Sequence, residues 1–173
     1  DFYTAIDTDF SVSHGYTSQN ENPRMMGDIN GDGRADIVGI NDNQVRFAYG
    51  QADGTFSQPN IDDGSYNIMS ESDGWTSQEE FPRMLADIDG DNRDDIFGYD
   101  SVNDKLMVAY ASDEGFARPV ELSGIEGDTI ADFIDHNDYS YNNYPLTTAD
   151  ITGNGQDNIV GFGTSDMFAA VWS

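Results

Sequence analysis

Three segments of this chain repeat one another in register, and this periodicity limits the folds available to it. The copies are Asp28–Ile40, Asp87–Tyr99 and Asp150–Phe162, so the motif recurs roughly every 60 residues. A repeat of this length is one supersecondary unit that stacks on its neighbours. We therefore predict a single domain, residues 1–173, with repeats at approximately 1–61, 62–122 and 123–173.

Each repeat is predicted to contain four short strands separated by turns rich in Asn, Asp and Gly. In the first repeat the strands are expected near residues 24–29, 36–40, 44–49 and 55–61. No window keeps the i, i+3, i+4, i+7 apolar spacing of a helix for three turns, so the expected class is all-β. Four-stranded sheets that recur at this interval are typical of the blades of a β-propeller.

Three blades are too few to close a propeller ring, which usually has about four to eight. The third repeat stops after its expected third strand, and residues 1–6 could form an extra strand ahead of the first repeat. One hypothesis is therefore a homodimer with a six-bladed ring, in which each N-terminus completes the last blade of the partner. The other hypothesis is that the chain is a fragment of a longer propeller.

The repeated turns carry oxygen atoms at alternate positions, as a calcium-binding loop does. Counting from the first aspartate of each copy, side chains at positions 1, 3, 5 and 9 and the carbonyl of position 7 are predicted to surround one ion. Ca²⁺ takes about six to eight oxygen ligands, and glycine permits the tight turn around it. The predicted ligands of the first two loops are Asp28, Asn30, Asp32, Arg34 and Asp36, then Asp87, Asp89, Asp91, Arg93 and Asp95.

The third loop is degenerate. It offers one carboxylate, Asp150, beside Thr152, Asn154 and, at position 9, Asn158. We expect a weak site or none there. An EF-hand is excluded because position 12 is glycine in every copy, where that motif needs a bidentate glutamate. The alternative interpretation is that these residues only form hydrogen-bonded turns, but two strong copies in register favour calcium.

The charge of the chain restricts its partners. The sequence has 33 acidic and 7 basic residues, a formal net charge of −26. This balance disfavours nucleic acid and anionic membrane surfaces, and no run approaches the ~20 apolar residues of a membrane span. There is no cysteine, and neither histidine lies in a Ser-His-Asp or zinc-type sequence pattern, so no enzyme activity is predicted. A secreted protein is expected, since extracellular calcium fills weak sites.

These residues resemble the FG-GAP/VCBS repeat family, and within it the propeller lectins of the Psathyrella velutina type. The shared order is a Trp or Tyr, then Pro-Arg, then an Asp-Ile-x-Gly-Asp-Gly loop, and finally Asp-Ile-Val-Gly-Phe. The resemblance covers nearly the whole chain. It implies a β-propeller, calcium in the first two loops, a metal-free third loop, and sugar pockets between neighbouring blades.

Several aromatic and basic side chains are candidates for contacts with sugars. They are Tyr16, Arg24, Trp75, Arg83, Tyr139 and Tyr141, with His14 and His136 as further donors. The alternative is that the aromatics fill the space between blades. The third repeat departs from the pattern, with Pro145-Leu146 in place of Pro-Arg. Two functions therefore stay open: a calcium-dependent glycan-binding protein, or a structural or adhesion propeller without sugar affinity.

Overall fold

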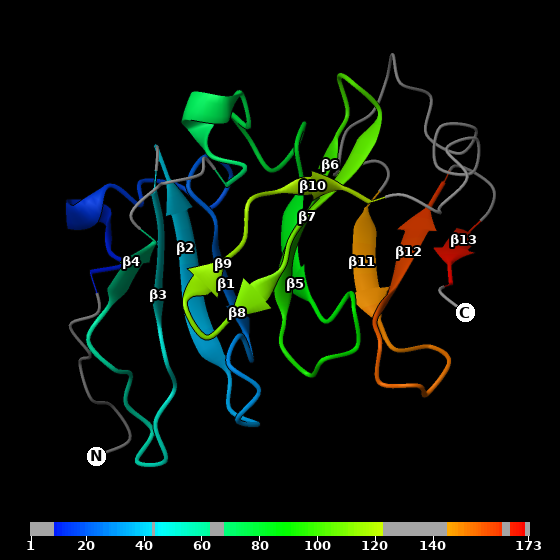
Figure 1. Cartoon of the computed structure of the whole chain (residues 1–173). Coiled ribbons are helices and arrows are strands. Elements are labelled where there is room, and N and C mark those ends of the chain that lie inside the picture. The colour runs from blue at the N-terminus through cyan, green and yellow to red at the C-terminus, as the bar shows by residue number, and fades with distance from the viewer. Residues whose placement is uncertain (1–8, 43, 63–67, 123–144, 164–166, 172–173) are drawn as a thin grey trace.

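The computed structural model is an all-β protein in which three antiparallel sheets follow one another along the chain (Figure 1). It describes residues 9–42, 44–62, 68–122, 145–163 and 167–171. In these ranges the helical structure is limited to two short 3-10 turns, η1 (Val12–His14) and η2 (Glu71–Asp73). The predicted all-β class is confirmed, with one sheet for each of the three acidic loops.

The sheets repeat one strand order. The first contains β1 (Arg24–Gly27), β2 (Asp36–Asn41), β3 (Gln44–Ala48) and β4 (Asn60–Asp62). The second contains β5 (Arg83–Ala86), β6 (Asp95–Asp100), β7 (Lys105–Ala109) and β10 (Val120–Glu121). The third contains β11 (Leu146–Ala149), β12 (Asn158–Phe162) and β13 (Met167–Ala170). A small hairpin of β8 (Ala111–Ser112) and β9 (Gly115–Phe116) follows β7.

Two of the predicted strand limits were wrong. The first strand ends at Gly27 and not near residue 29, because the backbone of Asp28 already belongs to the acidic loop. The strand expected over 55–61 is confined to Asn60–Asp62. Pro59, just before it, has no N–H to give to a ladder. Phe56 pairs instead with Gly50 in an isolated bridge, the counterpart of the β8–β9 hairpin.

A glycine in the second strand of each sheet makes room for an aromatic ring. In the first two sheets the register is the same, with Arg24 opposite Gly39 and Arg83 opposite Gly98. A Cβ atom on Gly39 would lie 2.6 Å from the ring of Tyr16, and one on Gly98 would lie 2.6 Å from the ring of Trp75. These glycines are therefore required by the close approach of the rings that precede each sheet.

The sheets stack as blades, with their first strands side by side. Strand β1 lies against β5, and β5 lies against β11, while the later strands of each sheet lie progressively further away (Figure 1). Apolar side chains fill both spaces between sheets. Burial of this surface is the main force that holds neighbouring blades together. Within the described residues there is no helix with the length and apolar character that a membrane span requires.

Candidate functional site

The three acidic loops share one backbone conformation. In the first loop the carboxylate of Asp28 accepts hydrogen bonds from the N–H groups of positions 4, 5 and 6, at 2.8, 3.1 and 2.6 Å. Asp87 and Asp150 accept the corresponding three bonds. Positions 4 and 6 have positive φ in every loop, and Asn92 (φ 68°) stands where the others have glycine. Asparagine tolerates this region, so each loop keeps its curvature through its own hydrogen bonds.

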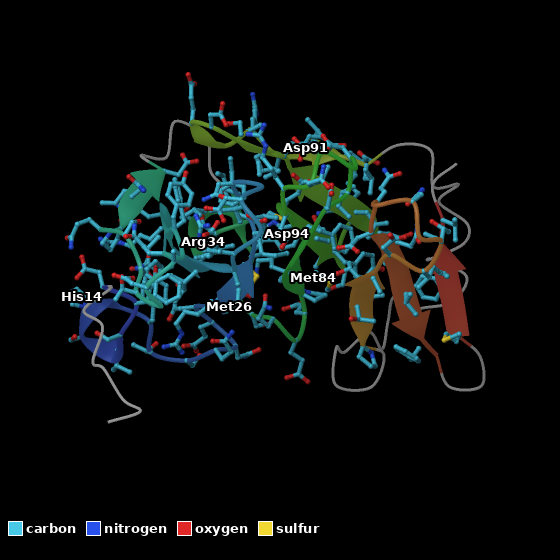
Figure 2. All side chains as sticks on the ribbon, turned by 90° about the horizontal axis from the view of Figure 1, so that it is seen from below. His14, Met26, Arg34, Met84, Asp91 and Asp94 are labelled. Carbon is cyan, nitrogen blue, oxygen red and sulfur yellow. The ribbon has the colours of Figure 1, made fainter. Side chains whose placement is uncertain are left out.

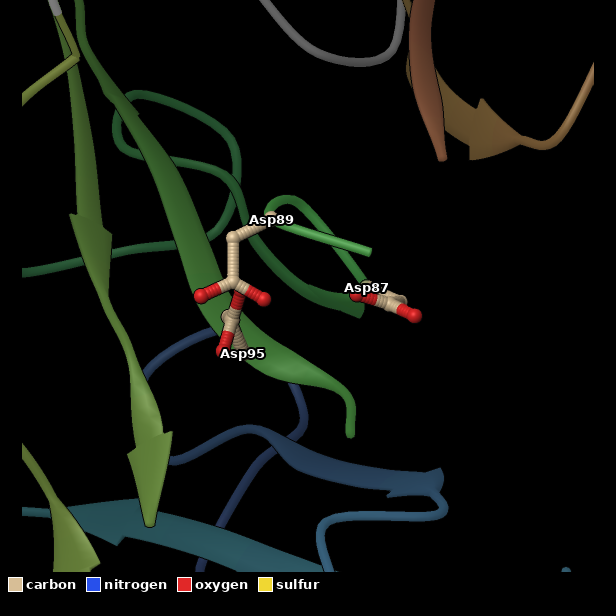
Figure 3. A group of neighbouring side chains, drawn as sticks. All are labelled: Asp87, Asp89 and Asp95. Atoms are coloured by element: carbon tan, nitrogen blue, oxygen red, sulfur yellow. The ribbon is translucent and has the colours of Figure 1, made fainter. Parts of the chain in front are cut away.

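The second loop gathers three carboxylates around one point (Figure 3). Asp87 follows β5, Asp89 lies in the turn, and Asp95 begins β6; one oxygen from each lies within 4.8 Å of the others. Such a set of hard oxygen donors fits Ca²⁺. The residues present in this loop thus suit the predicted ion, through three of the four predicted carboxylates.

The fourth predicted carboxylate, at position 5 of the second loop, forms an ion pair with an arginine side chain. Asp91 pairs with Arg93 at 3.4 Å, and Arg93 also reaches Asp113 at 2.7 Å. In the first loop Arg34 pairs with Asp32 in the same way. The arginine was predicted to supply its backbone carbonyl, and the structure shows that its side chain neutralises the position-5 carboxylate.

The carboxylate at position 9 is buried and ties the loop to its sheet. Asp95 accepts hydrogen bonds from Ala111 N at 2.8 Å and Ile88 N at 3.1 Å, and Asp36 accepts the equivalent pair. Burial raises the pKa of Asp95 to about 7, and this effect outweighs the two N–H hydrogen bonds, which lower the pKa. The pKa of Asp36 is raised for the same reason. A divalent cation would reverse this preference for the neutral form.

The third loop keeps the shape of the others with less charge. Thr152 donates its hydroxyl to Asp150 at 3.4 Å, and Asn154 accepts from Gln156 N at 2.9 Å. N–H groups, that of Gly155 foremost, hold the pKa of the Asp150 carboxyl below its usual range. Asn158 replaces the buried aspartate of position 9 and accepts from Ile151 N at 3.2 Å. The weak third site stays a prediction.

Sequence reasoning missed the carboxylate at position 8, which joins neighbouring loops. Asp94 of the second loop accepts a hydrogen bond from Asp28 N at 2.8 Å and donates its own N–H to the Asp28 carbonyl at 2.7 Å. Asp157 of the third loop binds Asp87 in the same two ways, at 3.2 and 2.7 Å. We call this pair of bonds the position-8 clamp. Figure 2 shows Asp94 between the first and second sheets. The aspartate at position 8 of the second and third loops, where the first loop has Ala35, was the available signal.

The aromatic sugar candidates within the described residues are packed in the protein. Tyr16 is 0% exposed and Trp75 is 7% exposed, and each ring lies 5.6 Å from a phenylalanine ring. Tyr139 and Tyr141 lie outside the described residues. The role of these four side chains in sugar binding stays a prediction.

The two arginine candidates hold the segments that precede their sheets. Arg83, 2% exposed, donates from Nη1 to the carbonyls of Met69 and Trp75, both at 3.0 Å. Its Nη2 is buried without a hydrogen-bond partner in the described part of the chain. Arg24 is more accessible and lies over the ring of Tyr16. Arg83 therefore retains an unused donor between the first two blades.

The structure places His14 between a serine and an aspartate, although the sequence around it shows no Ser-His-Asp pattern. Its Nδ1 is 3.0 Å from Ser11 Oγ and its Nε2 is 3.2 Å from Asp9 Oδ1. All three belong to one turn at the surface. In the second repeat Ser70 donates to Asp73 at 2.9 Å in the corresponding turn, without a histidine. We therefore interpret this arrangement as side-chain contacts within the surface turn that carries η1, whose N-cap residue Ser11 makes no side-chain cap bond. The motif Ser-x-Ser-x-Gly at 11–15 and 70–74 could have revealed the repeated turn.

Calcium affinity is expected to fall steeply in mild acid. The pKa of Asp95 in the folded, metal-free protein, about 7, lies above its ordinary value of 3.8. Its contribution to stability is therefore present below about pH 4 and is lost as the pH rises to about 7. Calcium needs the carboxylate, so its affinity follows the opposite course and should be roughly 30-fold weaker at pH 5.5 than at pH 8. Calorimetric titration at both pH values tests this; equal affinities would contradict it.

Repeated antiparallel sheets, each with an acidic loop between its first two strands and stacked through their first strands, define a β-propeller repeat protein. Residues 28–98 match the FG-GAP-like repeat family. A lectin of Agrocybe aegerita, described as recognising non-reducing terminal N-acetylglucosamine, matches with 26% identity and a TM-score of 0.75. That match covers 97% of this chain and 39% of the lectin. Residues 28–98 therefore contain an FG-GAP-like repeat, and the chain as a whole is similar in fold to a propeller lectin.

Another similar structure shows how widely the fold is used. The Photorhabdus luminescens Tc holotoxin pore matches with 21% identity and a TM-score of 0.59, over 86% of this chain and 6% of that one. At this identity the likeness concerns the fold alone. No curated protein sequence matches the chain. The chain spans well under half the length of either of these structural relatives, 39% and 6%.

Proposed function

We propose that this chain contributes its blades to a calcium-binding β-propeller that binds carbohydrate. The observation that carries the proposal is the likeness to the N-acetylglucosamine-recognising lectin over 97% of the chain. The three converging carboxylates of the second loop support the calcium part. The proposed ligands of the first loop are Asp28, Asn30, Asp32, Asp36 and the carbonyl of Arg34. The carbonyl of Arg93 and Asp91 complete the second.

The proposed sugar pocket lies between adjacent blades, beside Arg83. A buried N–H without an acceptor is unfavourable, and Arg83 Nη2 has no acceptor among the residues that the structure describes. Burial lowers the pKa of Arg83 to about 10, which leaves it charged at neutral pH. A sugar hydroxyl or N-acetyl oxygen would supply the missing acceptor without requiring a second charge. Arg24 is the corresponding donor of the first repeat.

Binding of N-acetylglucosamine tests the proposal directly. We expect calorimetric titration to show binding that Arg83→Gln weakens at least tenfold, because the guanidinium donors are removed. Arg118→Gln is the matched control, since Arg118 is an exposed arginine distant in sequence from this position. Melting curves of both variants separate lost binding from lost folding. If the folded protein binds neither this sugar nor any glycan of a broad array, the proposal is contradicted. The protein would then be an adhesion or structural propeller, the second function left open above.

Other parts of the interpretation remain proposals. A non-catalytic role accords with the lectin likeness. An extracellular location would supply enough calcium for sites of modest affinity. The ring could be completed by a second copy of the chain or by further repeats of a longer one. These two possibilities require different surfaces to pack against the last blade.

A further inference from the structure

The third blade presents an apolar face that its two counterparts bury. In each repeat the equivalent face consists of three residues. One directly follows loop position 1, one lies near the end of the second strand, and one lies near the start of the third strand. In the first repeat these residues are Ile29, Ile40 and Val45, exposed by 3, 1 and 3%, and in the second they are Ile88, Tyr99 and Leu106, at 2, 1 and 7%. In the third repeat they are Ile151, Phe162 and Met167, at 53, 43 and 64%. We call these three residues the open face.

The next blade along the chain covers the equivalent residues. The first repeat's set packs in one cluster with Ile68, Met69 and Trp75 of the second repeat. The second repeat's set packs with Leu146, Ile159 and Phe168 of the third. The two interfaces within this chain therefore show which surface fits such a face. It is the apolar side that the following blade turns toward it, which we call the back face of that blade.

The polar half of the same interface is also open on the third blade. The backbone N–H and carbonyl of Asp28 and Asp87 are bound by the position-8 clamps of Asp94 and Asp157. Those of Asp150 have no partner in the part of the chain that the structure describes, and Asp150 is exposed. An incoming blade with aspartate at loop position 8 would satisfy both groups.

We propose that the open face and the Asp150 backbone form a docking surface for a blade of the second-repeat type. Such a blade has aspartate at loop position 8 and an apolar residue at the position of Ile68. The first repeat of a second copy is not this blade. It carries Ala35 at position 8 and Asp9 in place of Ile68. It would leave the Asp150 N–H without a carboxylate, and would bring a charge to an apolar face.

The back face of the first repeat is polar at other positions too. Arg46 stands opposite Gly39, where Met107 stands opposite Gly98 in the second repeat. Arg46 pairs with Asp9 at 3.5 Å, and His14 shares the same carboxylate. Desolvating this group against Phe162 and Met167 would be unfavourable. The surface chemistry thus disfavours the first repeat of a second copy as the occupant of the open face.

Sedimentation equilibrium of the full chain tests the proposal. We expect the unaltered protein to have the mass of one chain, 19.0 kDa, at about 50 μM, a concentration at which specific interfaces associate. The double variant Asp9→Ile with Ala35→Asp gives the first repeat the second repeat's chemistry. It should raise the self-association constant at least tenfold, and adding Ile151→Asp should reverse the gain. Val102→Asp is the control, since Val102 is also an exposed apolar residue (67%, against 53% for Ile151) and lies in the β6–β7 turn.

Two results would overturn the proposal. One is an unaltered protein that is a stable dimer and dissociates on Ile151→Asp, because a second copy would then be the occupant. The other is a double variant that keeps its native melting temperature and associates no more than the unaltered protein. Ala35→Asp alone, at an exposed loop position, keeps the test valid if Asp9→Ile disturbs the fold. It should still raise self-association.

Discussion

Millimolar Ca²⁺ is expected to raise the melting temperature of the metal-stripped protein by roughly 10–20 °C. A ligand at 100 times its dissociation constant stabilises the folded state by about 2.7 kcal/mol per site. In a chain of this size each kcal/mol corresponds to roughly 2–4 °C. Two such sites together give the expected rise. Calcium would also relieve the repulsion among the like charges of Asp87, Asp89 and Asp95. Differential scanning calorimetry with and without a chelator measures it.

Variants separate specific binding from general screening of a chain with net charge −26. Asp89→Asn should remove about half of the calcium-induced rise, because it takes one of three converging carboxylates from the second loop. Glu114→Gln changes the net charge equally at an exposed position and should leave the rise intact. If the two variants lose the same part of the rise, calcium acts only by screening. Mg²⁺ should be a poor substitute, since it favours octahedral sites with several waters.

Asp95→Ala is expected to be the most destabilising single substitution among the loop aspartates. Both carboxylate oxygens accept buried N–H groups, those of Ala111 and Ile88. Alanine would leave both donors unpaired, each at a cost of about 1–3 kcal/mol, and would remove a calcium ligand. Urea denaturation should therefore show a loss of roughly 2–6 kcal/mol in the free energy of unfolding of the metal-free protein.

Asparagine at this position distinguishes the structural role from the metal role. Asn158 occupies the equivalent place in the third repeat and still accepts from Ile151 N. Asp95→Asn should therefore retain most of the metal-free stability and yet lose the calcium-induced part from the second loop. Asp100→Asn, at the other end of β6, is the control and should change neither quantity appreciably. An alanine variant as stable as the asparagine variant would show that the buried N–H bonds matter little.

The periodicity of the sequence predicted the blades well because the strands are local. Turn residues and β-branched runs fixed β2 and β3 to within a residue, and the acidic loop between β1 and β2 followed from the spacing of Asp28 and Asp36. The outer strand was harder to predict, because its pairing depends on where Pro59 interrupts the ladder.

The contacts between repeats could not be predicted in the same way. Asp94 and Asp157 bind the preceding loop, and no local pattern states which backbone groups lie opposite them. Tyr16 and Trp75 were offered both as sugar contacts and as packing residues. Their burial against Gly39 and Gly98 depends on the three-dimensional register of the sheets.

Calcium binding by the first two acidic loops is the proposal on which the interpretation of this protein depends. Calorimetric titration of the metal-stripped chain with Ca²⁺ at pH 8 tests it most directly. We predict two binding events per chain, the tighter one at the second loop, with one lost in Asp28→Asn and both lost in Asp28→Asn with Asp87→Asn. Absence of binding heat, confirmed by equilibrium dialysis, or binding that survives in the double variant, would contradict the assignment.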